Sequence, residues 1–382
     1  MKLSSIFTNN INAGKLFNIP DQPVNVMLDV TNYCNNRCLF CYNTGDSTYR
    51  SDKIDVASLK QIVSIIGENG TKEILYLGGE PFSFPEMRDI LRTGRKYGML
   101  QRAVSNGSFL KNKDTCRDLK DCGLDEIGFS FHSAREAIHD KLAGRKGSFR
   151  DAIVAVENSL NAGISVSVQY SPTRLNSKQD IIELAMYIRE KISSEVILFD
   201  INRLLPLGYG SNHDDLFFDG DEWFLFLCEA STLFQQGFDV RAELTPFCWL
   251  EYKAGLYGIP DKIINAVFSM NRGCFMWVAQ LALDYKGRVK FCPAGGFVGP
   301  SILEVKWPDF WKTWESFKQY RNFLWNNNCV DYKTKSTCAF FYRCLGGCKY
   351  SKGTHYQLDR YAIDFIESNN KGGMYEKNSK AK

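Results

Sequence analysis

The sequence lacks a long hydrophobic run. No stretch of its 382 residues approaches the roughly 18 consecutive apolar residues of a membrane-spanning helix. Residues 1–20 also lack the apolar core of a secretory signal peptide. Charge of one sign is scarce too, because 47 Lys and Arg stand against 43 Asp and Glu and leave a formal net charge of +4. These absences predict a cytoplasmic protein that binds neither membranes nor nucleic acid.

Cysteine, in contrast, is abundant. The chain has 13 cysteines, which is an odd number. Secreted proteins that depend on disulfides are usually small and have even counts. We therefore expect reduced thiols that bind metal. The remaining composition, 44% hydrophobic and 24% charged, is that of an ordinary globular protein, and the sequence has no internal repeat or low-complexity tract.

Three cysteines lie within eight residues near the beginning of the chain. Cys34, Cys38 and Cys41 are spaced C-x3-C-x2-C. Structural zinc sites close with four ligands, usually in C-x2-C pairs, and a [4Fe–4S] cluster also takes four cysteines. Three thiolates on one loop therefore indicate a cluster with one iron left open for substrate. The alternative is three buried thiols, but the intervening Asn, Asn and Arg residues indicate a polar loop.

Strand and helix patterns alternate over the first 210 residues. Helical patterns cover 56–68, 150–162 and 178–191, and they lie between six short apolar runs that predict strands, namely 24–30, 73–77, 101–105, 126–131, 164–170 and 195–201. Such alternation predicts a parallel sheet, here a partial (β/α)6 TIM-like barrel in the α/β class. In a barrel, chemistry gathers where the strands end. The cysteine loop, Gly78-Gly79-Glu80-Pro81, Asn106-Gly107, His132 and Asn202-Arg203 all stand at predicted strand ends.

The pattern changes after residue 210. We expect an amphipathic helix over 221–236, a hairpin over 281–291 that turns at Lys286-Gly287, and an aromatic-rich helix over 308–325. A second group of cysteines begins at Cys274 and ends at Cys348. These patterns predict an N-terminal extension (1–23), the barrel (24–210), a helical bridge (211–270), a small cysteine-rich α+β domain (271–350) and a polar tail (351–382).

The cysteine spacing, together with Gly-Gly-Glu-Pro after the second strand, resembles the radical S-adenosylmethionine (radical SAM) enzymes over residues 24–210. The segment 139–144 (His-Asp-Lys-Leu-Ala-Gly), followed by Gly147-Ser148-Phe149, is similar to a stretch in members with auxiliary clusters. The later cysteines resemble the SPASM domain of those members, Cys274 and Cys292 in its first half and Cys338, Cys344 and Cys348 in its second.

The resemblance implies a [4Fe–4S] cluster on Cys34, Cys38 and Cys41, whose fourth iron chelates S-adenosylmethionine (SAM). One electron from a reductase then cleaves SAM to a 5′-deoxyadenosyl radical, which takes a hydrogen atom from the substrate. A dry barrel pocket suits such a radical.

The resemblance also implies roles for further residues. Gly78 and Gly79, in the motif that Pro81 closes, would let backbone approach the methionine end of SAM, and Glu80 would accept its ammonium group. Ser105 and Asn106 would face the ribose. For three other residues the alternatives stay open: Tyr42 near the adenine or in the core, and Ser130 and Arg145 at the carboxylate of SAM or as strand-end and surface groups. His132, where many relatives carry an acid, is interpreted as structural.

The later cysteines predict one or two auxiliary [4Fe–4S] clusters. Family pairing implies that Cys274, Cys292 and Cys348 serve the first, with Cys248 or an open iron as the fourth site. Cys329, Cys338 and Cys344 would serve the second. The sequence departs from the SPASM pattern because eight residues separate Cys329 from Cys338 and no cysteine follows Cys348. For Cys329 and Cys338 the alternative is a zinc site or structural thiols. The smaller twitch domains of related enzymes keep one auxiliary cluster only. Three helical cysteines are assigned to the core: Cys116, Cys122 and Cys228.

The sequence leaves three functions to distinguish. The first is an oxidoreductase that crosslinks or oxidises a ribosomally made peptide, whose leader is bound either by a separate leader-recognition protein or by the barrel directly. Epimerisation ranks lower, because it often needs a thiol hydrogen donor and residues 123–227 contain no cysteine. The second is a radical SAM dehydrogenase or epimerase of a small molecule. The third is a zinc-ribbon nucleic-acid-binding protein, which needs paired C-x2-C motifs and basic clusters that the sequence lacks.

Overall fold

The computed structural model describes residues 20–43, 55–176, 180–243, 245–295, 297–307 and 309–319. Four of the predicted metal ligands lie outside these residues: Cys329, Cys338, Cys344 and Cys348. Within the described part, no helix is long and apolar enough to cross a membrane.

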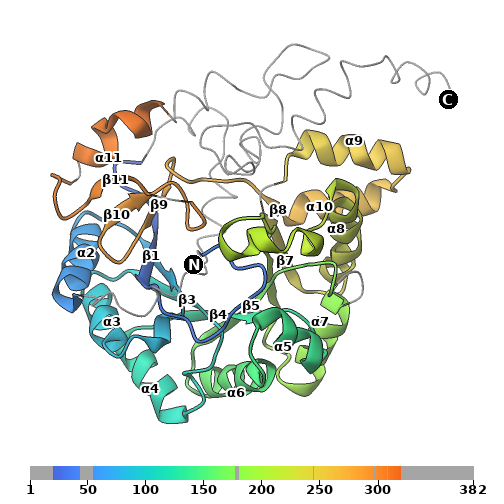
Figure 1. Cartoon of the computed structure of the whole chain (residues 1–382), viewed down its shortest axis with the longest axis horizontal. Coiled ribbons are helices and arrows are strands. Elements are labelled where there is room, and N and C mark those ends of the chain that lie inside the picture. Colours follow the sequence, from blue (N-terminus) through green and yellow to red (C-terminus); the bar gives the residue numbers. More distant parts are fainter. Residues whose placement is uncertain are drawn as a thin grey trace.

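The predicted α/β barrel is confirmed (Figure 1). Six strands pair in parallel in chain order: β1 (Asn25–Thr31), β2 (Glu73–Gly78), β3 (Leu100–Ser105), β4 (Glu126–Phe131), β5 (Ser165–Tyr170) and β6 (Leu198–Ile201). Six helices lie outside them: α2 (Val56–Glu68), α3 (Met87–Lys96), α4 (Lys113–Cys122), α5 (Glu136–Ala143), α6 (Ser148–Asn161) and α7 (Asp180–Lys191). Most predicted bounds agree to within one or two residues.

Successive side chains along each strand point alternately outward, into the core beneath the helices, and inward, into the barrel interior. Residues such as Ile74, Ile127 and Phe129 point outward and are fully buried against the helices, whose apolar faces include Leu59 and Ile62 of α2. Helix ends follow local chemistry: the Asp55 carboxylate accepts from the Ala57 N–H and caps α2, and a glycine in the left-handed region follows the end of α4.

Side chains on the inner faces of the strands are partly polar. Arg102 of β3 forms ion pairs with Glu73 of β2 and Glu126 of β4, at 3.0 Å and 2.6 Å. Gln169 of β5 donates to Asp200 of β6 at 2.8 Å. Ser167 of β5 donates to Glu126 of β4 at 3.1 Å. Together these contacts join strands β2 to β6 and leave the ends of the strands to carry the site.

The sheet is larger than the sequence predicts. β7 (Asp239–Glu243) and β8 (Asn271–Arg272) continue it in parallel beyond β6, and β9 (Gln280–Leu283) pairs in parallel with β1 at the other side. The predicted hairpin is present, since β10 (Arg288–Lys290) pairs antiparallel with β9, and β11 (Phe297–Ser301) pairs antiparallel with β10. One 11-stranded sheet therefore crosses the boundaries expected at residues 210 and 270.

The segment expected to be a helical bridge contains both helices and strand β7. Its helical elements are η3 (Gly208–Asn212), η4 (Asp214–Leu216), α8 (Gly220–Gln235), α9 (Phe247–Tyr257) and α10 (Asp261–Met270). β7 was not predicted because its sequence, Asp-Val-Arg-Ala-Glu, is mostly charged. The strand buries only one face, through Val240 and Ala242. The helix expected over 308–325 is interrupted, because α11 (Asp309–Thr313) ends before Trp314 and a second helical turn follows at 315–319.

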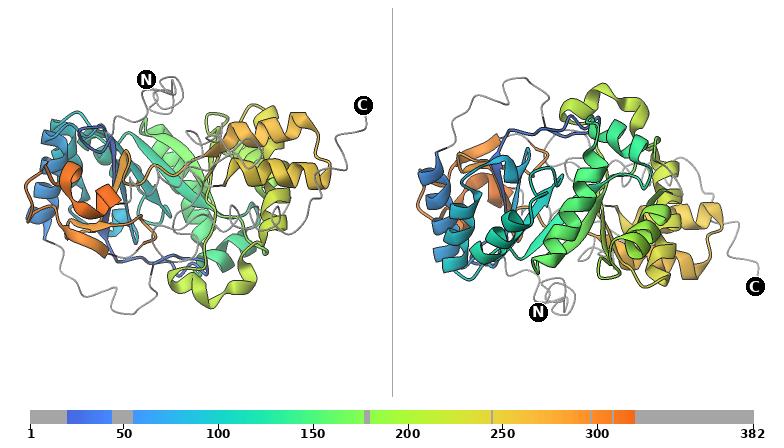
Figure 2. Two further views of the ribbon diagram at one scale, coloured as in Figure 1. Left: turned by 90° about the horizontal axis from the view of Figure 1, so that it is seen from above. Right: turned by 90° about the horizontal axis from the view of Figure 1, so that it is seen from below.

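A seam segment, residues 273–279, leads from β8 at one edge of the parallel strands to β9 beside β1. A bridge between Met276 and Gln280 marks its arrival at β9. Figure 2 shows helices α8–α10 (yellow-green to gold) and the β9–β11 region with α11 (orange) at opposite ends of the molecule. Cys274 lies in the seam segment that joins these two ends.

Candidate functional site

The three clustered cysteines occupy the loop that leaves the end of β1. The Thr31 hydroxyl accepts from the Tyr33 N–H at 3.1 Å, which bends the chain out of the strand. The Cys41 N–H donates to the Cys38 carbonyl at 3.1 Å and forms a tight turn. All three cysteines are partly buried and none forms a disulfide. Their position at the end of a strand is the one that a barrel enzyme uses for chemistry.

The Gly-Gly-Glu-Pro loop packs directly on the cysteine loop. The Gly79 N–H donates to Thr31 O and the Glu80 N–H to Tyr33 O, both at 2.7 Å. A Cβ on Gly79 would stand 2.0 Å from Tyr33 O, and one on Gly78, at φ +125°, would stand 2.2 Å from Thr31 O. The two glycines therefore permit contact between two backbones. Their predicted approach to the methionine end of a cofactor stays a prediction.

Glu80 is a buried carboxylate at the centre of the site, with 1% exposure. It accepts from Ser105 Oγ at 2.8 Å, from the Asn106 N–H at 2.8 Å and from the Phe82 N–H at 3.2 Å. Burial raises the pKa of Glu80 to about 7, although these hydrogen bonds and the nearby Arg145 oppose the rise. Glu80 thus joins the ends of β2 and β3 and holds a charge that can change near neutral pH.

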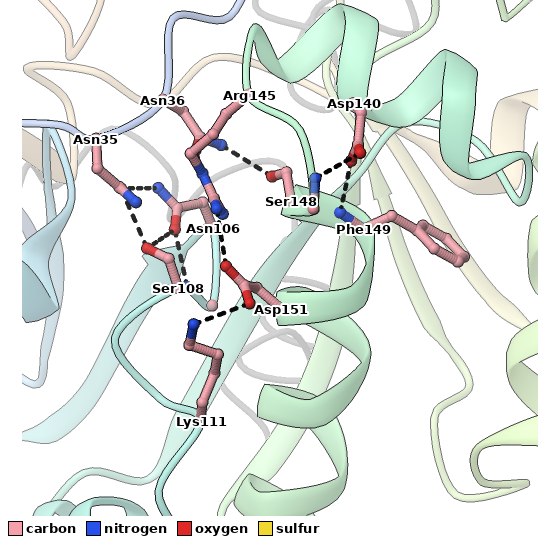
Figure 3. Close-up of polar contacts among 12 residues, drawn as sticks. Asn35, Asn36, Asn106, Ser108, Lys111, Asp140, Arg145, Ser148, Phe149 and Asp151 are labelled. Carbon is pink, nitrogen blue, oxygen red and sulfur yellow. Dashed lines mark hydrogen bonds and ion pairs between the residues drawn. The ribbon is translucent and has the colours of Figure 1, made fainter.

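Arg145, between α5 and α6, is partly buried and contacts the cysteine loop. Its Nε donates to Asn36 Oδ1 at 2.6 Å, and its Nη1 lies 2.8 Å from Asp151 Oδ2 (Figure 3). Lys111 contacts the other oxygen of Asp151 at 3.1 Å. The remaining nitrogen, Nη2, is buried and has no hydrogen-bond partner among the residues that the structure describes. One nitrogen of a fixed guanidinium therefore has no acceptor within the described part of the chain and is available to a bound ligand.

The segment 136–149 holds the cysteine loop from the other side. Arg37 N donates to Ala143 O and Leu39 N to Leu142 O, both at 3.0 Å. Gly144, at φ +62°, lies so close that a Cβ would stand 2.1 Å from Arg37 O. The Asp140 carboxylate accepts from the N–H groups of Gly147 and Phe149 at 2.6 Å and 2.9 Å and fixes the turn into α6 (Figure 3). This segment therefore positions the cysteines.

Asparagines lie within the cysteine loop and beside it, and the sequence analysis assigned no site role to the two within it, Asn35 and Asn36. The buried Asn36 donates from Nδ2 to Ser148 Oγ at 3.1 Å. Asn106, which follows β3, donates from Nδ2 to Asn35 Oδ1 at 3.0 Å and to Cys34 Sγ at 3.7 Å. Figure 3 shows Asn35, Asn106 and Ser108 in one group. The polar residues between the cysteines were the available signal.

The thiols are in surroundings that oppose their ionisation. Burial, and after it the charge of Glu80, raises the pKa of Cys34 to about 12. Burial raises the pKa of Cys38 and Cys41 as well, and neighbouring thiolates add to the rise at Cys38. Three thiolates this close need cations beside them, which iron supplies. No three His, Cys, Asp or Glu side chains of the described ranges converge on one metal ion, and a cluster does not require that, since its cysteines bind different irons.

Three other predicted residues lie around this centre. Tyr42 leaves the cysteine loop, and its carbonyl is approached by Gly208 of η3, where a Cβ would stand 2.1 Å away. Ser130 lies near the end of β4, opposite Gln169 in register. The cofactor contacts of both stay predictions. His132 is buried between Phe40, edge-on at 4.8 Å, and His139, stacked at 5.3 Å.

Two cysteines of the second group come together near the seam segment. Cys274 lies in this segment and Cys292 follows β10. Burial raises the pKa of Cys292 to about 12, and the charge of Cys274 adds to the rise, so the two thiols are close enough to interact electrostatically. Cys248 lies in α9. Cys116 and Cys122 are buried on α4, and Cys228 is partly buried on α8.

Known proteins resemble this chain in sequence and in fold. Residues 28–188 match the radical SAM superfamily. An AdoMet-dependent heme synthase of Oleidesulfovibrio alaskensis is 19% identical over 326 residues, which cover 84% of this chain and 81% of the relative. The crystal structure of Streptococcus suis SuiB bound to precursor peptide SuiA aligns with a TM-score of 0.66 at 18% identity, over 90% of this chain and 76% of SuiB.

A further structure, anSMEcpe with bound AdoMet and Cp18Cys peptide, aligns with a TM-score of 0.62 at 16% identity, over 90% of this chain and 95% of that one. Similarity at this level of identity shows a common fold. The family match covers both the cysteine loop at the end of β1 and the glycine loop beside it. Residues 28–188 therefore form a domain of the radical SAM superfamily.

Proposed function

We propose that this protein is an oxidoreductase that uses SAM and a [4Fe–4S] cluster to remove a hydrogen atom from a peptide side chain, which leads to a crosslink or an oxidised residue. A cluster with bound SAM supplies a 5′-deoxyadenosyl radical after one-electron reduction. Cys34, Cys38 and Cys41 would hold three irons and leave the fourth open. The observation that most supports this proposal is that Glu80 and Arg145 both lie next to this loop.

Glu80 and Arg145 suit the two charges of an amino-acid head group. The Glu80 carboxylate, near the cysteines, would accept from the ammonium group of SAM. The buried Arg145 Nη2, which lacks a partner in the described part of the chain, would donate to the carboxylate. Arg145 is already held in place by Asn36 and Asp151, so little side-chain freedom is lost on binding.

A peptide substrate is supported by the fold that this chain shares with SuiB and anSMEcpe, both of which were solved with a peptide. The relative that is a heme synthase, whose product is a small molecule, favours the alternative, a dehydrogenase or epimerase of a small molecule. A peptide substrate implies a precursor peptide, whose leader would be bound by a separate recognition protein or by the barrel itself, and either reaction needs a reductase.

The C-terminal cysteines would add one or two auxiliary [4Fe–4S] clusters in a SPASM- or twitch-type domain. Support comes from Cys274 and Cys292, whose charges interact near the seam segment of the barrel. Cys348 would join the first set, with Cys248 or an open iron as the fourth site. Cys329, Cys338 and Cys344 would form the second set, which is one ligand short.

The test is anaerobic reconstitution with iron and sulfide, followed by SAM and a reductant. We expect 5′-deoxyadenosine, and more of it when the true substrate is present. Peptides encoded beside the gene and tetrapyrroles should be compared as substrates. A Cys34/Cys38/Cys41→Ala triple variant should form none yet keep iron. Production of 5′-deoxyadenosine by that variant would contradict the proposed function, and an iron-free variant would contradict the auxiliary clusters.

A further inference from the structure

Asn106 lies against a cysteine of the site with its amide in a fixed orientation. Its backbone N–H donates to Glu80 Oε2 at 2.8 Å, which anchors the residue at the end of β3. Its side chain is almost completely buried. The orientation of the amide is set by its surroundings, because Oδ1 accepts from the N–H and the hydroxyl of Ser108, at 3.0 Å and 2.6 Å. Two donors at this atom identify it as the oxygen.

The other end of the amide, Nδ2, then points to acceptors only. It donates to Asn35 Oδ1 at 3.0 Å and lies 3.7 Å from Cys34 Sγ. An amide NH2 has two hydrogens, one for each of these acceptors. Figure 3 shows the links from Asn106 to Asn35 and Ser108 that hold the amide in this position. The contact therefore joins a rigid, buried donor to the sulfur of a predicted iron ligand.

We propose that the Asn106 side chain is a positioning residue that raises the reduction potential of the cluster on Cys34, Cys38 and Cys41 by donating a hydrogen bond to Cys34 Sγ. The inference rests on the proposed function, because it requires that cluster. Reduction adds negative charge to the sulfurs of a cluster, so a donor to sulfur stabilises the reduced form more than the oxidised form. Hydrogen bonds of the residues around the ligands are a recognised control of cluster potentials.

This role differs from a contact with the ribose of SAM, and the two make different predictions. A ribose contact affects the affinity for SAM and leaves the SAM-free cluster unchanged. A hydrogen bond to Cys34 Sγ affects the cluster before SAM is bound. The potential of the SAM-free protein is therefore the decisive measurement, and a purely structural role would not shift it.

The experiment is a redox titration of the full-length reconstituted protein without SAM, followed by electron paramagnetic resonance. The signal of the barrel cluster is the one that changes when SAM is added afterwards. Asn106→Asp keeps the shape and removes the amide donor, and Asn106→Ala removes the side chain. Ser108→Ala is the matched control, because it removes a neighbour of Asn106 and leaves the Nδ2 donor and the Ser108 N–H in place.

Both Asn106 variants should titrate at a more negative potential than the wild type, by more than any difference between the wild type and Ser108→Ala. Iron and sulfide content is measured for each protein, so that only variants with a full cluster are compared. If Asn106→Asp assembles no cluster, Asn106→Ala decides. Unchanged potentials in a loaded Asn106 variant would overturn the inference alone, and a wild-type protein without a SAM-sensitive cluster would overturn the proposed function as well.

Discussion

The Lys290 ammonium lies 2.7 Å from Asp29 Oδ2 and thereby links the second cysteine region to the first strand of the barrel. It also donates to the Pro293 carbonyl at 2.6 Å. Asp29 is buried, and burial raises its pKa even though Lys290 opposes the rise. Because Lys290 stands two residues before Cys292 and Asp29 five before Cys34, this pair ties the two cysteine regions together.

Lys290→Met should destabilise the protein by about 3–5 kcal/mol, because it leaves the Asp29 carboxylate buried without a counter-charge. Asp29→Asn in the same chain should restore part of this loss. Denaturant unfolding under anaerobic conditions measures both effects. Arg92→Ala breaks an exposed ion pair with Asp89 and is the control, with an expected cost below about 1 kcal/mol. Equal costs at the two sites would contradict this account.

Gly79→Ala should prevent the cysteine loop from packing, because the new Cβ meets the Tyr33 carbonyl oxygen. The expected cost is about 1–3 kcal/mol or more, together with reduced iron incorporation on reconstitution. Gly163→Ala is the matched control, since Gly163 is also at a loop, with φ +74° and no atom within 4 Å of a Cβ. It should cost about 1 kcal/mol for the left-handed backbone and leave the iron content unchanged.

SAM should bind more tightly as the pH rises through about 7. The pKa of Glu80 is raised to about 7 by burial, so the carboxylate that would accept the ammonium group is mostly protonated below this pH and ionised above it. Glu80→Gln should weaken binding about tenfold, a typical loss for one charge-assisted hydrogen bond, and should remove the pH step. Equilibrium dialysis with labelled SAM between pH 6 and 8 measures both. The control is Glu86→Gln at an exposed neighbour, and a pH step that survives in Glu80→Gln argues against this role.

His139 should make the protein less stable in mild acid. Burial lowers the pKa of His139 to about 3, and the nearby Arg145 adds to this effect. The unfolded chain takes up a proton near pH 6.5 while the folded protein does not, so stability falls as the pH falls. The loss between pH 7 and pH 5 is about 2 kcal/mol for this group.

His139→Gln should remove that share of the pH dependence. Urea unfolding at pH 7 and pH 5 compares the variant with the wild type. The pKa of the buried His132 is also lowered. His132 therefore contributes its own loss of stability on acidification in both proteins. An identical loss on acidification in variant and wild type would show that His139 is not the source.

The sequence predicted the barrel well where periodicity was strong. The bounds of β4 and α2 agree with the prediction to the residue, because buried outward faces impose clear patterns. β7 and β8 were missed, since β7 alternates charged with small apolar residues and β8 has only two residues. Parallel pairing of β9 with β1 was also missed, because a pairing so distant along the chain leaves no local signal.

The candidate site was predicted in part. The cysteine spacing identified Cys34, Cys38 and Cys41, and the glycine loop was correctly expected at the next strand end. Spacing could not reveal that Gly79 contacts Tyr33 backbone, or that Asn36 binds Arg145. The first contact depends on how the loops after β1 and β2 pack together, and the second on how the 136–149 segment folds over the cysteine loop; both are properties of tertiary packing.

The pairing of β1 with β9 has a consequence for how the protein is made. Asn25 lies opposite Gln280, so one edge of β1 has no partner until the ribosome has translated most of the chain. An unpaired edge next to apolar residues is prone to aggregate. Nascent chains that stop before β9 should therefore depend on chaperones, and slow expression at low temperature should increase the yield of folded protein.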